Sequence, residues 1–226
     1  MQTEHYRKNK EEYWISRYQS YDAYWFHDGN PQRPYAELAG GKYSNFYADS
    51  TDLVSRSGEL LFLGQDLLES SSGRERPHAY NGSAYGAIAL AIELTRQAKA
   101  AQAWYTAKGA MRGQMVLDRF NFTDQIQTVA LVEDVISEFT TTRASIRAIE
   151  TKRDATQRTG RILPYVLCIV NRSGHDEIDG YQIISLINEK RAKTWSPGGN
   201  PFVRMGGELV PPVRPKQNWD ALTRSY

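Results

Sequence analysis

The hydrophobic and polar positions of this chain alternate between strand-like and helix-like patterns. The most apolar run, residues 162–170, predicts a buried strand with Pro164 near its beginning, and residues 129–132 predict a second one. Further strand-like segments start at Trp104, at Met115 and at Tyr181, and helical spacing covers residues 53–68, 87–101 and 143–158. This alternation predicts an α/β fold: a mainly parallel twisted sheet flanked by helices.

The two ends of the chain differ from its middle. Residues 1–35 are rich in Tyr and Trp, which fall partly at helical spacing, and residues 195–226 are rich in Pro and Gly with little periodicity. We therefore predict a helical, aromatic-rich N-terminal segment (1–35), an α/β domain (36–194) and a tail packed on that domain (195–226). We interpret these aromatic side chains as packing residues, because aromatic residues at helical spacing belong to a hydrophobic core far more often than to a ligand-binding cage.

Composition narrows the class of protein. The formal net charge of +2, from 28 Lys and Arg against 26 Asp and Glu, gives no field that would imply a nucleic-acid or membrane partner. Cys168 is the only cysteine, which excludes an internal disulfide and a cysteine-based zinc site. No apolar run approaches the roughly 20 residues of a membrane span. These features lead us to expect a cytoplasmic protein.

The segment most suggestive of chemistry is residues 129–145. Its apolar run leads into Glu133 and Asp134, then into a turn rich in hydroxyl groups, and then into a helical pattern. Ligands of open α/β sheets usually bind at the carboxyl ends of parallel strands. Two carboxylates there can bind a ribose diol or hydrated Mg²⁺, and hydroxyl and N–H groups at a helix N-terminus favour phosphate. The alternative is that both acids only end a strand and cap a helix.

Three further polar segments follow predicted strands. Residues 82–86 form a turn of small residues before a helix, residues 108–113 are flexible and basic, and residues 171–174 read Asn-Arg-Ser-Gly. The chain has no Gly-x-Gly-x-x-Gly after an N-terminal strand, no Walker loop and no His-Glu-x-x-His helix. Without that glycine motif, a dinucleotide-binding module is not expected. The four histidines are scattered along the sequence, so a histidine-based metal site is not expected either.

Taken in order, these segments resemble the type I phosphoribosyltransferases, and most of all the orotate phosphoribosyltransferases. Residues 129–136 resemble the strand and paired acids of the family signature, and residues 82–86 resemble the pyrophosphate-binding turn. Residues 108–119 resemble the mobile catalytic loop, residues 171–174 the base-contacting loop, and residues 38–47 the N-terminal substrate segment. The resemblance covers roughly residues 36–216, and it implies that the sheet is accompanied by a small N-terminal hood-like segment.

The resemblance implies that this chain transfers a phosphoribosyl group from phosphoribosyl pyrophosphate to a base, with orotate as the first candidate. It implies a homodimer and Mg²⁺ carried by the substrate pyrophosphate, without a metal site of the protein's own. The implied catalytic residues are Lys108, Arg112 and Asp134. The implied substrate-binding residues are Glu133 and Asp134 for ribose, Ser137, Thr140 and Thr141 for the 5′-phosphate, Ser83, Ala84 and Tyr85 for pyrophosphate, Phe46, Tyr47 and Arg172 for the base, and Lys42 in the N-terminal substrate segment.

The phosphate loop departs from the family pattern. Glu138 and Phe139 stand where the family has a hydroxyl residue and a glycine. A carboxylate pointing inward would repel a phosphate, and a side chain at a glycine position restricts the backbone. Two hypotheses therefore stay open: an active phosphoribosyltransferase with a reshaped loop, or a protein of the same fold that binds nucleotide or sugar phosphate in a regulatory role without turnover.

Overall fold

The computed structural model describes residues 4–30, 32–38, 41–83, 85–199 and 210–223. The chain divides into two compact units. One, here called the sheet unit, comprises Met1–Glu11 and Ser50–Lys190, and the other, the flank unit, comprises Glu12–Asp49 and Arg191–Tyr226. The predicted N-terminal segment (1–35) is divided between the two units at residue 12, and the predicted tail (195–226) belongs to the flank unit.

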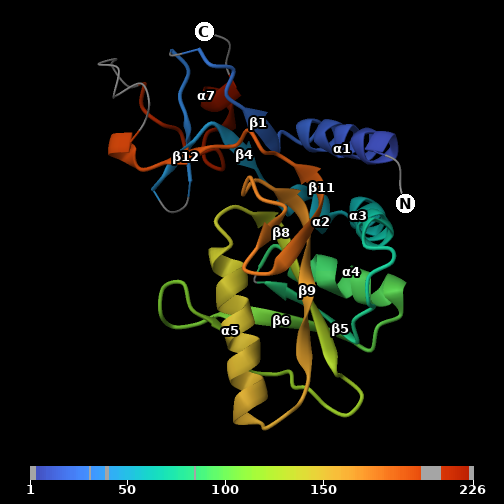
Figure 1. Cartoon of the computed structure of the whole chain (residues 1–226). Coiled ribbons are helices and arrows are strands. Elements are labelled where there is room, and N and C mark those ends of the chain that lie inside the picture. The colour runs from blue at the N-terminus through green and yellow to red at the C-terminus, as the bar shows by residue number, and fades with distance from the viewer. Residues whose placement is uncertain (1–3, 31, 39–40, 84, 200–209, 224–226) are drawn as a thin grey trace. The chain divides into compact units, whose positions relative to one another are not determined.

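The sheet unit is built on a seven-stranded sheet in the order β10-β11-β9-β8-β5-β6-β7 (Figure 1). Its five central strands pair in parallel, as the sequence predicted for a mainly parallel α/β fold. They are β5 (Ala79–Ser83), β6 (Gln102–Lys108), β8 (Thr128–Ile136), β9 (Arg161–Asn171) and β11 (Tyr181–Asn188). The short edge strands β7 (Met115–Val116) and β10 (Glu177–Ile178) pair antiparallel.

Helices cover both faces of this sheet (Figure 1). Helix α5 (Thr140–Ala155) lies on one face, and α3 (Ser57–Ser70) and α4 (Ile88–Ala98) lie on the other. The helix predicted over residues 53–68 is interrupted, because Arg56 is extended between α2 (Thr51–Ser55) and α3. Helix α1 (Glu4–Gln19) contributes residues to both units.

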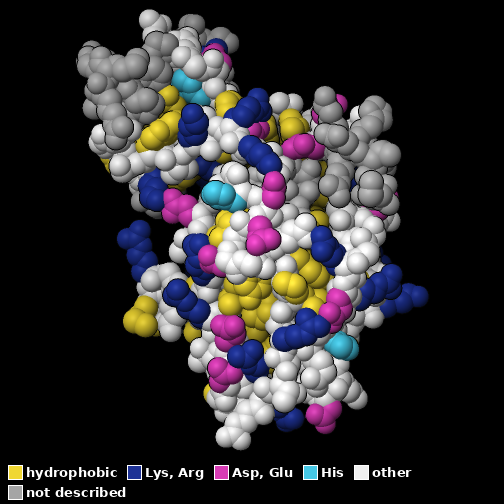
Figure 2. Space-filling model, viewed as in Figure 1, with side chains coloured by type: hydrophobic (Ala, Val, Ile, Leu, Met, Phe, Trp, Pro, Cys, Tyr) yellow, Lys and Arg dark blue, Asp and Glu magenta, His cyan; other side chains and the backbone are white. Residues whose placement is uncertain are grey.

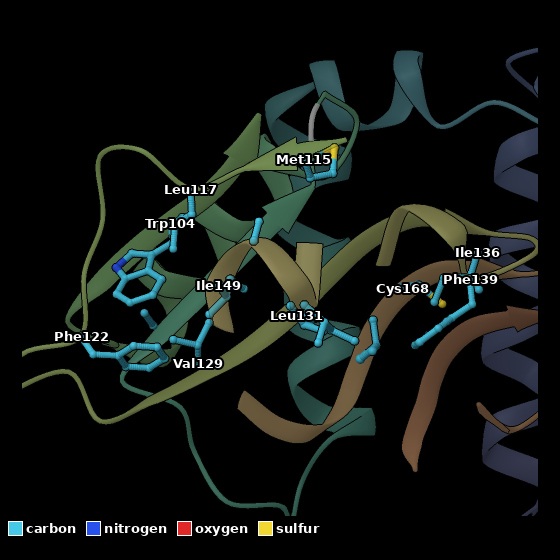
Figure 3. Close-up of a cluster of buried hydrophobic side chains, with 14 of the residues drawn as sticks. Trp104, Met115, Leu117, Phe122, Val129, Leu131, Ile136, Phe139, Ile149 and Cys168 are labelled. Atoms are coloured by element: carbon cyan, nitrogen blue, oxygen red, sulfur yellow. The ribbon is translucent and has the colours of Figure 1, made fainter. Parts of the chain in front are cut away.

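The core between the sheet and α5 follows the alternation of the strands. Val129 and Leu131 of β8 are buried in one cluster with Ile149 of α5 (Figure 3). Pro164 is accommodated in β9 opposite a register shift between Val129 and Leu131. Pairing of β9 with β11 starts only at Tyr165, so the proline, which has no N–H to donate, lies ahead of that ladder.

The flank unit contains short antiparallel strands. Strand β1 (Tyr24–Phe26) pairs with β4 (Phe46–Ala48), and β12 (Thr194–Trp195), β3 (Tyr43–Ser44) and β2 (Ala36–Glu37) form a three-stranded sheet. The C-terminal part adds the 3₁₀ turn η1 (Pro197–Gly199) and helix α7 (Trp219–Thr223), whose Leu222 packs with Trp25. Trp14 and Tyr18 are fully buried, in agreement with the prediction that the N-terminal aromatic residues are packing residues.

The surface carries charges of both signs. On the face shown in Figure 2, Lys and Arg side chains are interspersed with Asp and Glu around an exposed hydrophobic area. Among the described helices, none combines the length and the apolar character that crossing a membrane requires.

Candidate functional site

The two acids of the central motif lie on opposite faces of the sheet. Strand β8 continues through both of them to Ile136, whereas the sequence predicted that they follow the strand. Successive side chains of a strand point to opposite faces, so Glu133 and Asp134 diverge. Glu133 is only 4% exposed and faces α5, where its Oε1 accepts hydrogen bonds from Ser83 Oγ (2.7 Å) and Thr142 Oγ1 (2.9 Å). This burial is a correction to the expectation that Glu133 reaches a ribose.

Glu133 is one end of a buried chain of hydroxyl groups. Ser83 Oγ also lies 3.0 Å from Ser145 Oγ, which lies 2.8 Å from Thr106 Oγ1. Burial raises the pKa of Glu133 to about 8; the hydroxyl of Ser83 lowers it, the charge of Asp134 raises it, and the Thr142 hydroxyl lowers it. At neutral pH the carboxyl is therefore mainly protonated. It acts as a structural link between β5, β8 and α5.

Asp134 is partly exposed and points toward the turn that precedes α4. A side chain at Gly86 would overlap the Asp134 carboxylate, so only glycine leaves this carboxylate in place. Gly82 is similarly close to the carbonyl of Ala87, because the turn folds back on the end of β5. The small residues of this turn therefore bring its backbone against β5 and against Asp134.

The residues predicted to bind pyrophosphate have different environments. The Ser83 side chain is buried against Glu133, which removes its hydroxyl from the predicted role, and Ala84 lies outside the described residues. Tyr85 is 73% exposed, and Lys108 Nζ lies 5.2 Å from the centroid of its ring. The end of β6 is thus close to the turn that precedes α4.

Lys108 and Arg112 belong to a tight hairpin loop rather than to an irregular segment. Lys108 pairs with Met115 across the β6–β7 hairpin, and the Gly109 N–H donates to the Gln114 carbonyl. Both cations are exposed. Residues 108–115, together with Thr140 and Thr141 of the first turn of α5, line a pocket of about 600 Å³.

The most unusual backbone conformation in the phosphate loop is that of Phe139. This residue has φ 60° and ψ 11°, a left-handed conformation that glycine adopts without strain, and yet its ring is only 2% exposed. In Figure 3 the ring lies beside Ile136 and Cys168 in the core. Core packing of the aromatic ring therefore holds the backbone in a conformation that a glycine would otherwise provide.

The same loop is held from outside by Arg143. Its Nη1 donates to the Glu138 carbonyl (3.0 Å), its guanidinium lies 5.6 Å from the Phe139 ring centroid, and Nε pairs with Asp179 at 2.6 Å. The Ser137, Glu138, Thr140 and Thr141 side chains are exposed. The loop is thus ordered, and its hydroxyl groups lie at the N-terminus of α5.

Arg172 lies where the predicted base-contacting loop begins. Its backbone N–H donates to the Ile136 carbonyl (2.8 Å), which places it beside the end of β8, and its side chain is 7% exposed. Burial lowers its pKa to about 10, and the nearby charge of Glu138 raises it. The guanidinium stays cationic at neutral pH, with Glu138 as an electrostatic neighbour.

The residues predicted to contact the base from the N-terminal segment are in the flank unit. Lys42 is exposed, and the Tyr47 hydroxyl donates to Asp49 Oδ2 (3.3 Å). Phe46 is fully buried, and its ring centroid lies 5.0 Å from that of Tyr24. A ring with no exposed surface cannot stack on a base, so Phe46 is removed from the candidate site.

Solved structures resemble this chain over most of its length. An orotate phosphoribosyltransferase from Aeropyrum pernix superimposes with a TM-score of 0.55 at 19% identity, over 78% of this chain and 95% of the other. A phosphoribosyltransferase from Corynebacterium diphtheriae gives 0.51 at 15% identity, over 80% and 96%. UMP synthase from Leishmania donovani gives 0.55 at 13% identity, over 78% of this chain and 36% of that longer one.

This chain has the phosphoribosyltransferase fold. The similarity is one of structure: no protein-family model matches the sequence, and neither does any curated protein. The fold expected from the order of the motifs is therefore confirmed, while the roles of single residues stay predictions.

Within the phosphoribosyltransferase fold, three residues outside the predicted site determine its geometry. Thr142 holds Glu133, Arg143 holds the loop at Glu138, and Gly86 leaves room for Asp134. One of these had a signal in the sequence, since Arg143 follows Phe139 at the i, i+4 spacing at which helical neighbours meet. The other two depend on contacts between segments far apart in the chain.

Proposed function

We propose that this protein is a phosphoribosyltransferase, which transfers a 5-phosphoribosyl group from phosphoribosyl pyrophosphate to a nucleobase. The observation that carries the proposal is the pocket of about 600 Å³ in which the Lys108–Arg112 loop faces Thr140 and Thr141. A helix N-terminus and two exposed cations favour a ligand with several phosphate charges. The likeness of fold to phosphoribosyltransferases supports the same conclusion.

Each part of the ligand has a proposed partner. The 5′-phosphate would accept hydrogen bonds from the first turn of α5 and from the hydroxyls of Ser137, Thr140 and Thr141. Asp134 would accept hydrogen bonds from the ribose hydroxyls, because it is the acid that faces away from the buried hydroxyl chain. The pyrophosphate would lie between the turn at Tyr85 and the cation of Lys108, which lies above that ring.

In the proposed reaction a ring nitrogen of the base bonds to C1′ of the ribose as the bond from C1′ to the pyrophosphate oxygen breaks. Lys108 and Arg112 would stabilise the negative charge that the departing pyrophosphate gains, an effect of position and electrostatics. Mg²⁺ is part of the substrate in this scheme, bound to the oxygens of phosphoribosyl pyrophosphate. In the described residues, no three His, Cys, Asp or Glu side chains gather in a group that could hold a metal ion.

Orotate is the first candidate base. Arg172 keeps its charge and lies beside the end of β8, so it could pair with the carboxylate of a pyrimidine. Glu138 competes for that charge, because its carboxylate acts on the same guanidinium. Lys42 and Tyr47 are proposed as substrate-binding residues on the ground that residues 38–47 resemble the family's N-terminal substrate segment. The proposed enzyme is a homodimer, which light scattering after gel filtration can test.

A second function is supported by specific observations: binding of a nucleotide or sugar phosphate without turnover. Glu133 is withdrawn into the interior, and Phe139 replaces the glycine whose N–H could approach a phosphate closely. Only one of the two acids then remains for the ribose. Binding would persist through Asp134 and α5, whereas positioning of C1′ for displacement would be lost.

A base panel separates the two functions. The protein with Mg²⁺ and phosphoribosyl pyrophosphate is expected to consume orotate, measured as loss of its ultraviolet absorbance. Asp134→Asn should abolish turnover, while Glu133→Gln, on the adjacent residue of the strand, should retain it because the Glu133 side chain faces the interior. If no base of the panel is consumed but phosphoribosyl pyrophosphate gives calorimetric heat that Asp134→Asn removes, the binding function holds. If neither turnover nor heat is observed, both proposals are wrong.

A further inference from the structure

A second pocket lies at the amino ends of the parallel strands, at the opposite end of the sheet from the proposed phosphoribosyl site. It has a volume of about 360 Å³, and it is lined by the connection from α3 to β5, by the C-terminal end of α4 and by the side chains of Tyr80 and Tyr165. Helix α4 runs back from the carboxyl end of β5, so its last residues lie at the amino ends of the parallel strands. Nothing in the proposed reaction uses this pocket.

Three cations line this second pocket, and none of them has an acidic partner among the described residues. Arg74, Arg76 and Lys99 are exposed and take part in no ion pair there. The one acid in the lining, Glu75, is already paired, because Arg161 Nη2 donates to both of its carboxylate oxygens at 2.8 and 2.6 Å. The pocket therefore has an excess of three positive charges.

The lining of the pocket includes a tyrosine side chain. Tyr80 is only 2% exposed as a whole residue, and its side chain is one of those that line the pocket. Burial raises the pKa of the Tyr80 hydroxyl to about 12, and the charge of Arg76 lowers it. A tyrosine hydroxyl can donate one hydrogen bond, so Tyr80 could serve an anionic oxygen bound in the pocket.

The second tyrosine stabilises the wall of the pocket. The Tyr165 hydroxyl donates to the Glu75 carbonyl at 2.8 Å, which fixes the connection from α3 next to β9. Tyr80 is fixed in the sheet by the pairing of β5 with β8, where it lies opposite Ala130. The pocket is thus formed by the fold itself and does not depend on exposed side chains alone.

We propose that this second pocket binds a small compound with several phosphate charges, such as pyrophosphate or a phosphate monoester. Three cations and one hydroxyl donor suit a group with many acceptor oxygens, and the volume falls at the lower end of small-ligand sites. The site is independent of the proposed phosphoribosyl site, because Tyr80 and Ser83 lie toward opposite ends of β5.

The test is calorimetric titration of the whole protein with inorganic pyrophosphate, without Mg²⁺, at low and high salt. Binding at this pocket should weaken more than about tenfold in Arg76→Glu and fall with added salt, since each charged hydrogen bond is a large share of such an affinity. Tyr80→Phe removes only the hydroxyl and should weaken binding without unfolding the protein. Arg158→Glu, the same charge change on an exposed residue outside the lining, should have no effect.

Two further variants assign the heat to one pocket or the other. If pyrophosphate binding survives Lys108→Ala and is lost in Arg76→Glu, the inference holds, whether or not the protein has transferase activity. If binding is lost in Lys108→Ala and unchanged in Arg76→Glu and Tyr80→Phe, pyrophosphate binds only at the phosphoribosyl site and the inference is wrong. An absence of any heat also overturns it. Uridine monophosphate in a parallel titration shows whether a phosphate monoester is accepted as well as pyrophosphate.

Discussion

Replacing Glu133 by glutamine should stabilise the protein at neutral pH, although this residue lies in the most conspicuous acidic pair of the sequence. Its carboxyl is buried and accepts two hydroxyl hydrogen bonds on Oε1, from Ser83 and Thr142. Glutamine has the same shape and keeps an acceptor oxygen for both hydroxyls. It has no proton to lose, so its effect should depend on pH.

The magnitude follows from the pKa. Burial is the largest cause that raises the pKa of Glu133, from the ordinary 4.5 to about 8. As the pH rises, the unfolded chain loses this proton first, so the contribution of Glu133 to stability is complete below pH 4.5 and is lost toward pH 8. At 1.36 kcal/mol for each pKa unit, and with partial titration at both ends of the range, the loss between about pH 4.5 and pH 7.5 is about 3.5 kcal/mol.

The assay is urea unfolding followed by tryptophan fluorescence, for both proteins across this pH range. The difference in free energy of unfolding between Glu133→Gln and the parent protein should increase with pH by about 3.5 kcal/mol. Any fixed cost of the amide, such as a poorer hydrogen bond, shifts this difference equally at every pH. A difference that stays constant with pH would refute the conclusion that Glu133 is buried in its neutral form.

Three other changes test separate parts of the structure. Gly86→Ala should displace the Asp134 carboxylate and lower the proposed transferase activity by about tenfold or more, with little change in urea midpoint; unchanged activity would show that Asp134 needs no such space. Phe139→Ala should cost about 3 to 5 kcal/mol of stability by emptying the core, and Phe139→Gly should be about 1 kcal/mol less damaging, because glycine adopts positive φ freely. An equal or greater loss for glycine would contradict the strain argument. Cys168 is fully buried and burial raises its thiol pKa well above the usual value, so a thiol reagent should modify it only after unfolding; rapid labelling of the native protein would contradict this burial.

Much of the architecture was predictable because its signals are local. The apolar run at residues 162–170 and the helical spacing at 143–158 correspond to β9 and α5, with ends that differ by a few residues. Hydrophobic periodicity reports which face of an element is buried, and that is sufficient to recognise strands that alternate with helices. The order of the polar segments then pointed to the phosphoribosyltransferase fold.

The orientation of the Glu133 and Asp134 side chains was not predictable from the local sequence. The motif shows two adjacent carboxylates, but a strand that ends before them and a strand that continues through them have nearly the same local sequence. Tertiary structure decides between these alternatives, because β8 keeps pairing with β9 as far as Ile136. The alternation of side chains then sends Glu133 to the hydroxyl groups of α5 and Asp134 to the turn at Gly86.

Phe139 is a second residue whose conformation was not predictable from the local sequence. Because it stands where the family has a glycine, the sequence predicts a loop with a restricted backbone. In the structure the loop keeps the left-handed backbone, because burial of the ring with Ile136 and Cys168 compensates for the strain. The sequence alone therefore determined the order of elements, the fold class and the chemical types at each strand end. Only the tertiary structure decided which of those groups face a ligand, since orientation and burial depend on contacts between residues far apart in the chain.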